Sequence, residues 1–339
     1  MAARISKETS EKLRAITLAL SFLVVIIHCW SIPPNRMLDG RPFPAWIVCL
    51  QLFLSESFAR SAVPFFFAIS GFFLVKSFDG KIWPWWVGVC KKRLITLVIP
   101  FVLWNSAHLA FNVLIGEQSF SWRLIPDTVL GLGEPACRPF WYVRCLILYV
   151  LISPFLVMCL RNIVVGGGFM LFAFVALFFD KQTSFYVMGG MWIGLHLEQA
   201  RALLEWGRRR LRVPVLIVFA LSVLAVVWFS VRRDDLALRL VKQGMILSFV
   251  LTCWWHSNGL LRLVRNVGFA FGCTFFVYAF HKFLTTSTAL LLSQVLPATL
   301  YHTVGYVLRI PIAFFGSVWI AIGVRRYLPR LYGVLAGGR

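Results

Sequence analysis

The chain of 339 residues is 60% hydrophobic and only 14% charged, whereas soluble proteins are about 45–50% apolar and about 25% charged. This composition excludes a free cytosolic enzyme, a disordered chain and a disulfide scaffold, and it predicts an all-α polytopic membrane protein. The formal charge of +21 does not require nucleic acid, because Lys and Arg collect in the cytoplasmic loops of membrane proteins. We expect no nucleic-acid partner and no metal site, but one anionic ligand at the cytoplasmic face.

Ten apolar runs are long enough to cross a bilayer, for which a helix needs about 20 residues. The predicted spans are 15–32, 58–76, 94–115, 140–160, 163–180, 183–199, 213–231, 242–256, 270–295 and 302–323. The first run is preceded by Arg4 and other cations, as a signal peptide is, but the turn at Pro33 and Pro34 offers no small-residue cleavage site. We therefore expect it to remain as an anchor.

The distribution of Lys and Arg gives the orientation. With the N-terminus inside, the predicted inner segments, including residues 76–93 and 201–212, hold more than twice as many cations as the outer ones. Both the N-terminal segment 1–14 and the C-terminal tail 324–339 are then cytoplasmic, and 1–339 forms a single transmembrane domain. The eighth span is the weakest, because the basic connection before it falls on the outer side.

Two segments deserve separate interpretation. The run from Pro44 to Val75 is too long for one upright helix, and Glu56 and Arg60 divide it. We expect residues 45–56 to lie at the interface as an amphipathic segment that leads into a shorter span. The outer loop 116–139 is the longest and carries Glu117, Asp127 and Glu134, so it is the best candidate for a lid or an acceptor-binding element.

Ionisable side chains at membrane depth are costly and are therefore candidates for function. His28 lies about 20 Å from the inner end of the first span, and Arg60 and Arg144 fall at the same outer depth. Nearby cations keep an imidazole neutral and able to accept a proton. The structural alternatives are a histidine hydrogen-bonded to a neighbouring helix and an Arg60 that snorkels to the interface.

Further candidates are less specific. His281, beside Lys282, and His108 lie deep in predicted spans, and each is ambiguous alone. Trp141 and Tyr142 flank Arg144, and Ser70 precedes a glycine in an aromatic stretch, where a small pair also permits close helix packing. Cys29, Cys49 and Cys137 fall near the outer face, but their spacing does not establish a disulfide.

The basic cluster Lys91, Lys92 and Arg93 precedes the third span, and Arg14 lies at the inner mouth of the first. Such cations serve either as topology signals or as a seat for a phosphorylated ligand. Both interpretations stay open from the sequence.

Four segments together resemble the acyltransferase-3 family of integral-membrane acyltransferases. They are LRAITLALSFLVVIIHCW, with Arg14 before His28, ARSAVPFFFAISGFFL, CKKRLITLVIPFVLW and FWYVRCLILYVLISPF. Weaker similarities are SFYVMGGMWIG near residue 190 and FFVYAFH, which ends at His281. The likeness covers nearly the whole chain, without the soluble esterase-like domain that some members append.

The resemblance implies an O-acetyltransferase-like enzyme. It would take an acyl group, first of all acetyl, from cytoplasmic acyl-coenzyme A as donor substrate, with no permanently bound cofactor. The acceptor would be a hydroxyl of a cell-surface or lipid-linked glycan, and the enzyme would lie in the cell membrane, as in a bacterial inner membrane. His28, Arg144 and Arg60 would be catalytic, and Lys91, Lys92, Arg93 and Arg14 would bind the donor. The alternative is a transporter or channel for a small polar or anionic solute, in which intramembrane His and Arg are also expected.

Overall fold

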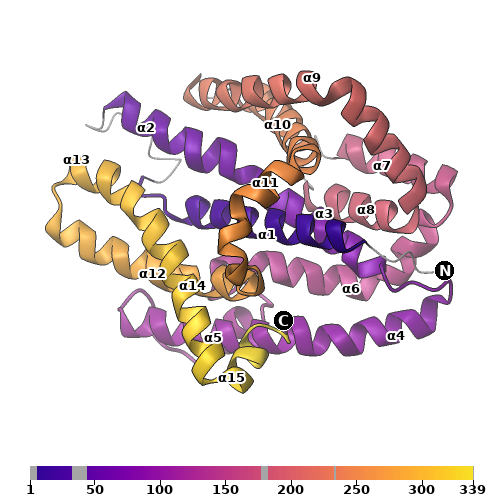
Figure 1. The fold of residues 1–339 in the computed structure, drawn as a ribbon. Coiled ribbons are helices and arrows are strands. Elements are labelled where there is room, and N and C mark those ends of the chain that lie inside the picture. Colours follow the sequence, from indigo (N-terminus) through magenta and orange to yellow (C-terminus); the bar gives the residue numbers. More distant parts are fainter. Residues whose placement is uncertain (1–5, 33–43, 177–181, 233, 339) are drawn as a thin grey trace. The chain divides into compact units, whose positions relative to one another are not determined.

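A computed structural model describes most of the chain (Figure 1). The described residues are 6–32, 44–176, 182–232 and 234–338. Throughout these ranges the regular structure is helical, which confirms the predicted all-α class. Arg4, the turn at Pro33 and Pro34, and the end of the predicted span 163–180 lie outside the described residues.

The chain divides into two compact units, which we call unit 1 and unit 2. Unit 1 consists of Met1–Ile82 and Phe155–Gly268, and unit 2 consists of Trp83–Pro154 and Phe269–Arg339. Each unit thus combines segments that are distant in sequence. The expectation of a single domain over the whole chain stays a prediction.

Most of unit 1 is built from eight described helices. They are α1 (Lys7–His28), α2 (Ala45–Gln51), α3 (Ala62–Val75), α7 (Ile163–Ala176), α8 (Gln182–Leu195), α9 (Leu197–Arg232), α10 (Asp235–Trp255) and α11 (Ser257–Val264). Among them, α3 packs on α8, α9 packs on α10, and α1 packs on α11.

Unit 2 holds the remaining helices of the described chain. They are α4 (Ile82–Arg93), α5 (Ile99–Leu114), α6 (Trp141–Leu160), α12 (Thr274–Val295), α13 (Ala298–Leu300), α14 (Tyr306–Tyr327) and α15 (Pro329–Leu335). Helix α4 begins at the last residue of unit 1, and α6 continues past Pro154 into unit 1. Helices α12 and α14 lie side by side (Figure 1).

Seven of the described helical segments are long and apolar enough to span a bilayer. They are Ala45–Val75, Ile82–Leu114, Arg138–Leu160, Leu197–Arg232, Asp235–Trp255, Thr274–Val295 and Ala298–Tyr327. The other three predicted spans correspond to α1 and to the shorter apolar helices α7 and α8. The prediction of a polytopic membrane protein is confirmed.

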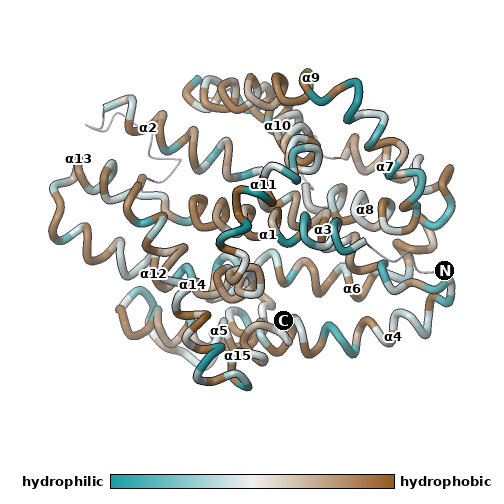
Figure 2. The backbone as a smooth tube through the Cα atoms, in the orientation of Figure 1, coloured by the Kyte–Doolittle hydropathy of each residue, from teal (hydrophilic) through white to brown (hydrophobic). Residues whose placement is uncertain are grey.

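Two predicted inner loops are largely helical instead. Of the predicted loop 76–93, residues 76–81 do connect two helices, but residues 82–93 form α4, which continues through the π-helical Leu94–Val98 directly into α5. Residues 201–212 lie within α9, which Figure 2 shows as hydrophilic over its first half and hydrophobic over its second. Charge and hydropathy locate the end of the apolar run, but Lys and Arg are good helix formers. The helix therefore extends beyond the predicted span.

Two further boundaries differ from the expectation. The segment 44–75 is not divided at Glu56 and Arg60, because the π-helical Leu52–Phe58 and the 3₁₀ turn Ala59–Ser61 join α2 to α3 without a break. The two charged residues pair with each other on this helix, so they do not interrupt it. Likewise α10 begins at Asp235 rather than at residue 242, since Asp234 caps it by accepting a hydrogen bond from the Ala237 amide at 3.1 Å.

Glycines bring α3 and α8 into close contact. A Cβ atom on Gly71 would lie 2.0 Å from the carbonyl oxygen of Val187, and a Cβ on Gly190 would lie 1.8 Å from that of Ala68. The packing interpretation of the Ser70–Gly71 pair is therefore confirmed for Gly71, because only a residue without a side chain fits there.

Candidate active site

His28 is the last residue of α1 and is half-buried. Buried polar side chains from the neighbouring helix form hydrogen bonds with the chain on either side of it. The Ser55 hydroxyl donates to the carbonyl of Ile26 at 2.9 Å, and the Gln51 amide donates to the Ser31 hydroxyl at 2.6 Å. The end of α1 that carries the imidazole is thus held in one place, as a catalytic base requires.

Arg60 lies in an ion cluster that the sequence analysis did not anticipate. Its Nε and Nη2 donate to Oε1 of Glu56 at 2.9 and 2.5 Å, and Lys242 donates to Oε2 of the same carboxylate at 3.4 Å. Glu56 is only 8% exposed, so a single buried carboxylate holds two cations. Arg60 is therefore an anchored charge rather than one that only snorkels.

The remaining candidates of unit 1 lie on α1 and α3. Arg14 is exposed and lies fourteen residues before His28 on the same helix. The two residues are therefore about 21 Å apart along the helix axis. Ser70 is half-buried.

In unit 2, His108 on α5 contacts α12, the helix that carries His281. His108 on α5 is buried, its Nε2 lies 3.1 Å from the carbonyl oxygen of Ala279, and its ring stacks on Phe283 with centroids 3.8 Å apart. His281 is fully buried, with Nδ1 3.0 Å from the carbonyl oxygen of Val277. Because a carbonyl only accepts, the neutral His108 ring carries its proton on Nε2 and keeps the Nδ1 lone pair.

Arg144 binds the outer loop rather than another ionisable group. Its Nη1 donates to the carbonyls of Gly131, at 3.3 Å, and Gly133. Gly131 has a φ of +76°, and a Cβ there would lie 2.6 Å from the Phe101 ring, so this turn requires glycine. The guanidinium thus fixes the shape of the loop.

The neighbours of Arg144 differ in environment. Trp141 is exposed, whereas Tyr142 is half-buried and its ring contacts that of Tyr278 edge to face at 5.8 Å.

Two more side chains, the buried Asn105 and the half-buried Tyr278, hold the same loop. The Asn105 side chain accepts a hydrogen bond from the Cys137 amide at 3.0 Å, and the Tyr278 hydroxyl donates to the carbonyl of Pro139. Together with Arg144, these contacts come from α5, α6 and α12. The C-terminal half of the loop is therefore a fixed wall. No disulfide contributes, because none links the eight cysteines, all of which the structure describes.

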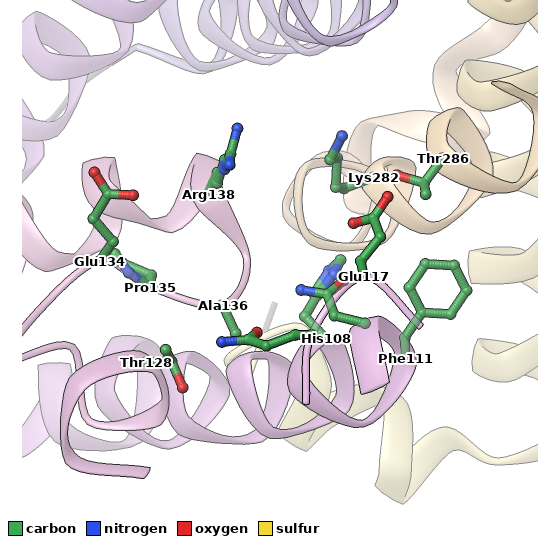
Figure 3. Close-up of a pocket in the computed structure, with 12 residues that line it drawn as sticks. His108, Phe111, Glu117, Thr128, Glu134, Pro135, Ala136, Arg138, Lys282 and Thr286 are labelled. Atoms are coloured by element: carbon green, nitrogen blue, oxygen red, sulfur yellow. The ribbon is translucent and has the colours of Figure 1, made fainter. Parts of the chain in front are cut away.

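This loop, α5 and α12 enclose a cavity of about 600 Å³ within unit 2 (Figure 3). His108 lines it, together with Glu117, Glu134, Arg138 and Lys282. Figure 3 shows Glu134 and Arg138 on one side and Glu117 and Lys282 on the other. The volume falls in the range of about 300–1,000 Å³ that is typical of small-molecule sites. The cavity supports the expectation that this loop contributes to a binding site.

The basic cluster lies at the last turn of α4, where Lys91 and Lys92 are exposed and Arg93 is half-buried. Residues 94–114, which follow it in the same helix, rise about 30 Å and match the hydrocarbon thickness of about 30 Å. The cluster therefore lies where a bilayer span of that length would end, even though the segment around it is helical.

The sequence-predicted residues fall into two sets. Unit 1 holds His28, Arg60, Ser70 and Arg14, and unit 2 holds Arg144, His108, His281, Trp141, Tyr142, Lys91, Lys92 and Arg93. The predicted common depth of His28, Arg60 and Arg144 stays a prediction.

Three polar residues with a clear structural role were missed. In the sequence, Gln51 and Asn105 differ from their neighbours only in being polar residues within apolar runs. Glu56 precedes Arg60 by four residues, the spacing of an ion pair on a helix, and that spacing was detectable.

A polytopic helical protein with buried histidines, a buried carboxylate and a polar cavity belongs to the class of membrane proteins that bind or transform polar substrates. The chain matches the acyltransferase domain family over residues 18–326 and therefore belongs to it. Succinoglycan biosynthesis protein ExoH of Rhizobium meliloti (strain 1021) is 26% identical over 328 residues, which cover 86% of this chain and 82% of that protein. No solved structure matches the chain significantly. The predicted family is confirmed, and the chain is a membrane O-acyltransferase rather than a transporter.

Proposed function

We propose that this enzyme transfers an acyl group, with acetyl as the first candidate, from cytoplasmic acyl-coenzyme A to a hydroxyl of a cell-surface or lipid-linked glycan. The observation that carries the proposal is the family match along nearly the whole chain, together with the likeness to a protein named for succinoglycan biosynthesis. The multi-pass architecture suits an enzyme of the cell membrane, such as a bacterial inner membrane, that has access to both faces.

His28 is the proposed general base. A sugar hydroxyl is too weak an acid to attack a thioester unaided, so the imidazole takes its proton as the new C–O bond forms. The C–S bond then breaks, and the coenzyme A thiolate takes up a proton. The anchored end of α1, held by Ser55 and Gln51, supports this role. In the variant mechanism His28 itself is acylated first, which ping-pong kinetics would reveal.

Arg60 and Arg144 are proposed to stabilise the negative charge that develops on the thioester oxygen, since a cation in a dry site does so better than in water. Arg60 shares the Glu56 carboxylate with Lys242, so this cluster has one more cation than anion. Arg144 uses Nη1 for the loop, and its guanidinium carries five N–H donors in all.

Lys91, Lys92, Arg93 and Arg14 are proposed to bind the phosphates of the donor at the cytoplasmic face. The phosphates cannot enter hydrocarbon, so only the pantetheine arm carries the thioester inward. Extended, this arm reaches on the order of 15–20 Å, comparable with the axial rise of about 21 Å between Arg14 and His28.

The experiment that tests the function measures coenzyme A release from acetyl-coenzyme A in membranes that contain the enzyme, with and without added glycan. The expected result is release that increases with glycan, and an added mass of one acetyl group on the glycan by mass spectrometry. Release of the free acid with no glycan product would contradict the proposed acceptor. If succinyl-coenzyme A is the better donor, the transferred acyl group is succinyl rather than acetyl.

A further inference from the structure

Four charged side chains line the cavity of unit 2. Among the residues that the structure describes, Glu117, Glu134, Arg138 and Lys282 form no ion pair within 4.0 Å. Glu117, Glu134 and Arg138 are exposed and Lys282 is half-buried, so these charges are open to a dissolved ligand. Four charged groups around one cavity of this volume favour a polar ligand over an apolar one.

The wall of the cavity is already formed. The loop that contributes Glu134 and Arg138 is held by Asn105, Arg144 and Tyr278 through hydrogen bonds to backbone groups. A ligand would thus meet fixed donors and acceptors and would lose little affinity to ordering the site.

The chemistry of the lining selects the kind of ligand. Two carboxylates and two cations have no net charge, and Asn112 and Gln118 add amides that both donate and accept. A phosphorylated ligand such as coenzyme A would meet the carboxylates as like charges, which costs affinity. A lipid tail would take water away from these charged groups and offer no hydrogen bond in return.

Sugar hydroxyls fit this lining, because each hydroxyl donates one hydrogen bond and accepts others. They can donate to Glu117 and Glu134 while accepting from Arg138 and Lys282, and Phe111 adds an apolar face. We propose that this cavity is the acceptor site and that it binds an uncharged sugar unit of the glycan. This inference rests on the proposed function and assigns its acceptor to unit 2.

The test uses the full-length enzyme in nanodiscs, without acyl-coenzyme A. Oligosaccharides released from the host cell's own surface polysaccharide serve as the probe, and their binding is measured by saturation-transfer NMR. The double variant Glu117→Gln, Glu134→Gln keeps the side-chain size and removes the two acceptors. We expect it to weaken binding at least tenfold, whereas Glu117→Asp, Glu134→Asp keeps most of it.

The matched control is Asp79→Asn, Glu198→Gln, which removes two exposed carboxylates of unit 1 and should bind as the parent does. Size-exclusion profiles show whether each variant is folded. Equal binding by parent and Gln variant would overturn the proposal, and so would displacement of the oligosaccharide by coenzyme A.

Activity separates this proposal from the function on which it rests. In the transfer assay the Gln variant should raise the KM for glycan at least tenfold and leave the KM for acyl-coenzyme A unchanged. If the parent transfers no acyl group to any glycan, the proposed function is wrong. If the parent transfers and the Gln variant keeps the parent's acceptor KM, only the acceptor cavity is wrong.

Discussion

The two units differ in whether their charged residues form ion pairs with one another. In unit 1, Glu56 is buried and holds Arg60 and Lys242, so the charges bind one another. In unit 2, Glu117, Glu134, Arg138 and Lys282 surround a cavity instead. A paired cluster stabilises helix packing, whereas charges that face a cavity are available to a ligand. Burial and partners together separate the two kinds of charge, since Glu56 is 8% exposed whereas Glu117 and Glu134 are exposed.

The largest effect should come from the histidines, of which each unit offers a candidate. His28→Ala in unit 1 should lower turnover at least about a hundredfold, because general-base catalysis typically contributes 10²–10⁴-fold, while expression stays normal. Coenzyme A release in membranes measures this. His256→Ala, another half-buried histidine of unit 1, is the control and should stay active. Retention of more than a tenth of the activity by His28→Ala would shift the role to His108 or His281 of unit 2.

The next prediction tests the paired cluster directly. Glu56→Gln leaves Arg60 and Lys242 without their carboxylate, and the loss of a buried charged partner typically costs about 1–3 kcal/mol. Because Arg60 is half exposed, we expect a loss toward the lower end of this range. Thermal unfolding in detergent measures it.

Glu134→Gln is the comparison from unit 2, and it should leave the unfolding temperature unchanged, since its carboxylate makes no ion pair among the described residues. Equal destabilisation by both substitutions would contradict the distinction between paired and ligand-binding charges.

Substitution of the basic cluster should weaken binding of the donor and leave binding of the acceptor unchanged. Lys91→Gln, Lys92→Gln, Arg93→Gln should raise the KM for acyl-coenzyme A by about tenfold, with a smaller change in kcat. Increasing salt should raise the KM of the parent more than that of the variant, because salt screens the attraction that the variant lacks.

These residues also help to orient the chain, so labelling of the loops must first show the original topology. The matched control is Arg208→Gln, Arg209→Gln, Arg210→Gln, from the basic half of α9. If this control raises the donor KM and the first triple does not, the phosphates bind near α9 instead.

The smallest effect is expected at Arg144. Arg144→Lys keeps the charge but loses the planar guanidinium that holds the Gly131 and Gly133 carbonyls. We expect kcat/KM for the glycan to fall by about three- to tenfold, in keeping with a hydrogen bond worth about 1 kcal/mol. Arg123→Lys, an exposed position in the same loop, should have no effect. Full activity of Arg144→Lys would leave Arg144 as a charge without a positioning role.

The sequence by itself determined the class, the family and the approximate position of every span. These follow from apolar runs and short motifs, which are local properties of the chain. It also predicted that loop 116–139 is a lid or an acceptor-binding element, and it left the roles of His108 and His281 open. It placed the helical residues 82–93 and 201–212 in loops, because hydropathy reports where the apolar run ends and not where the helix ends.

Only the tertiary structure decided which polar groups meet. Lys242 reaches Glu56 across 186 residues of sequence, His108 reaches the carbonyl of Ala279 across 171, and Asn105 reaches the Cys137 amide across 32. No periodicity or motif records such pairs, since they depend on how helices pack. The same packing determines that one set of charges is paired while another lines a cavity, and this difference separates a structural cluster from a candidate binding site.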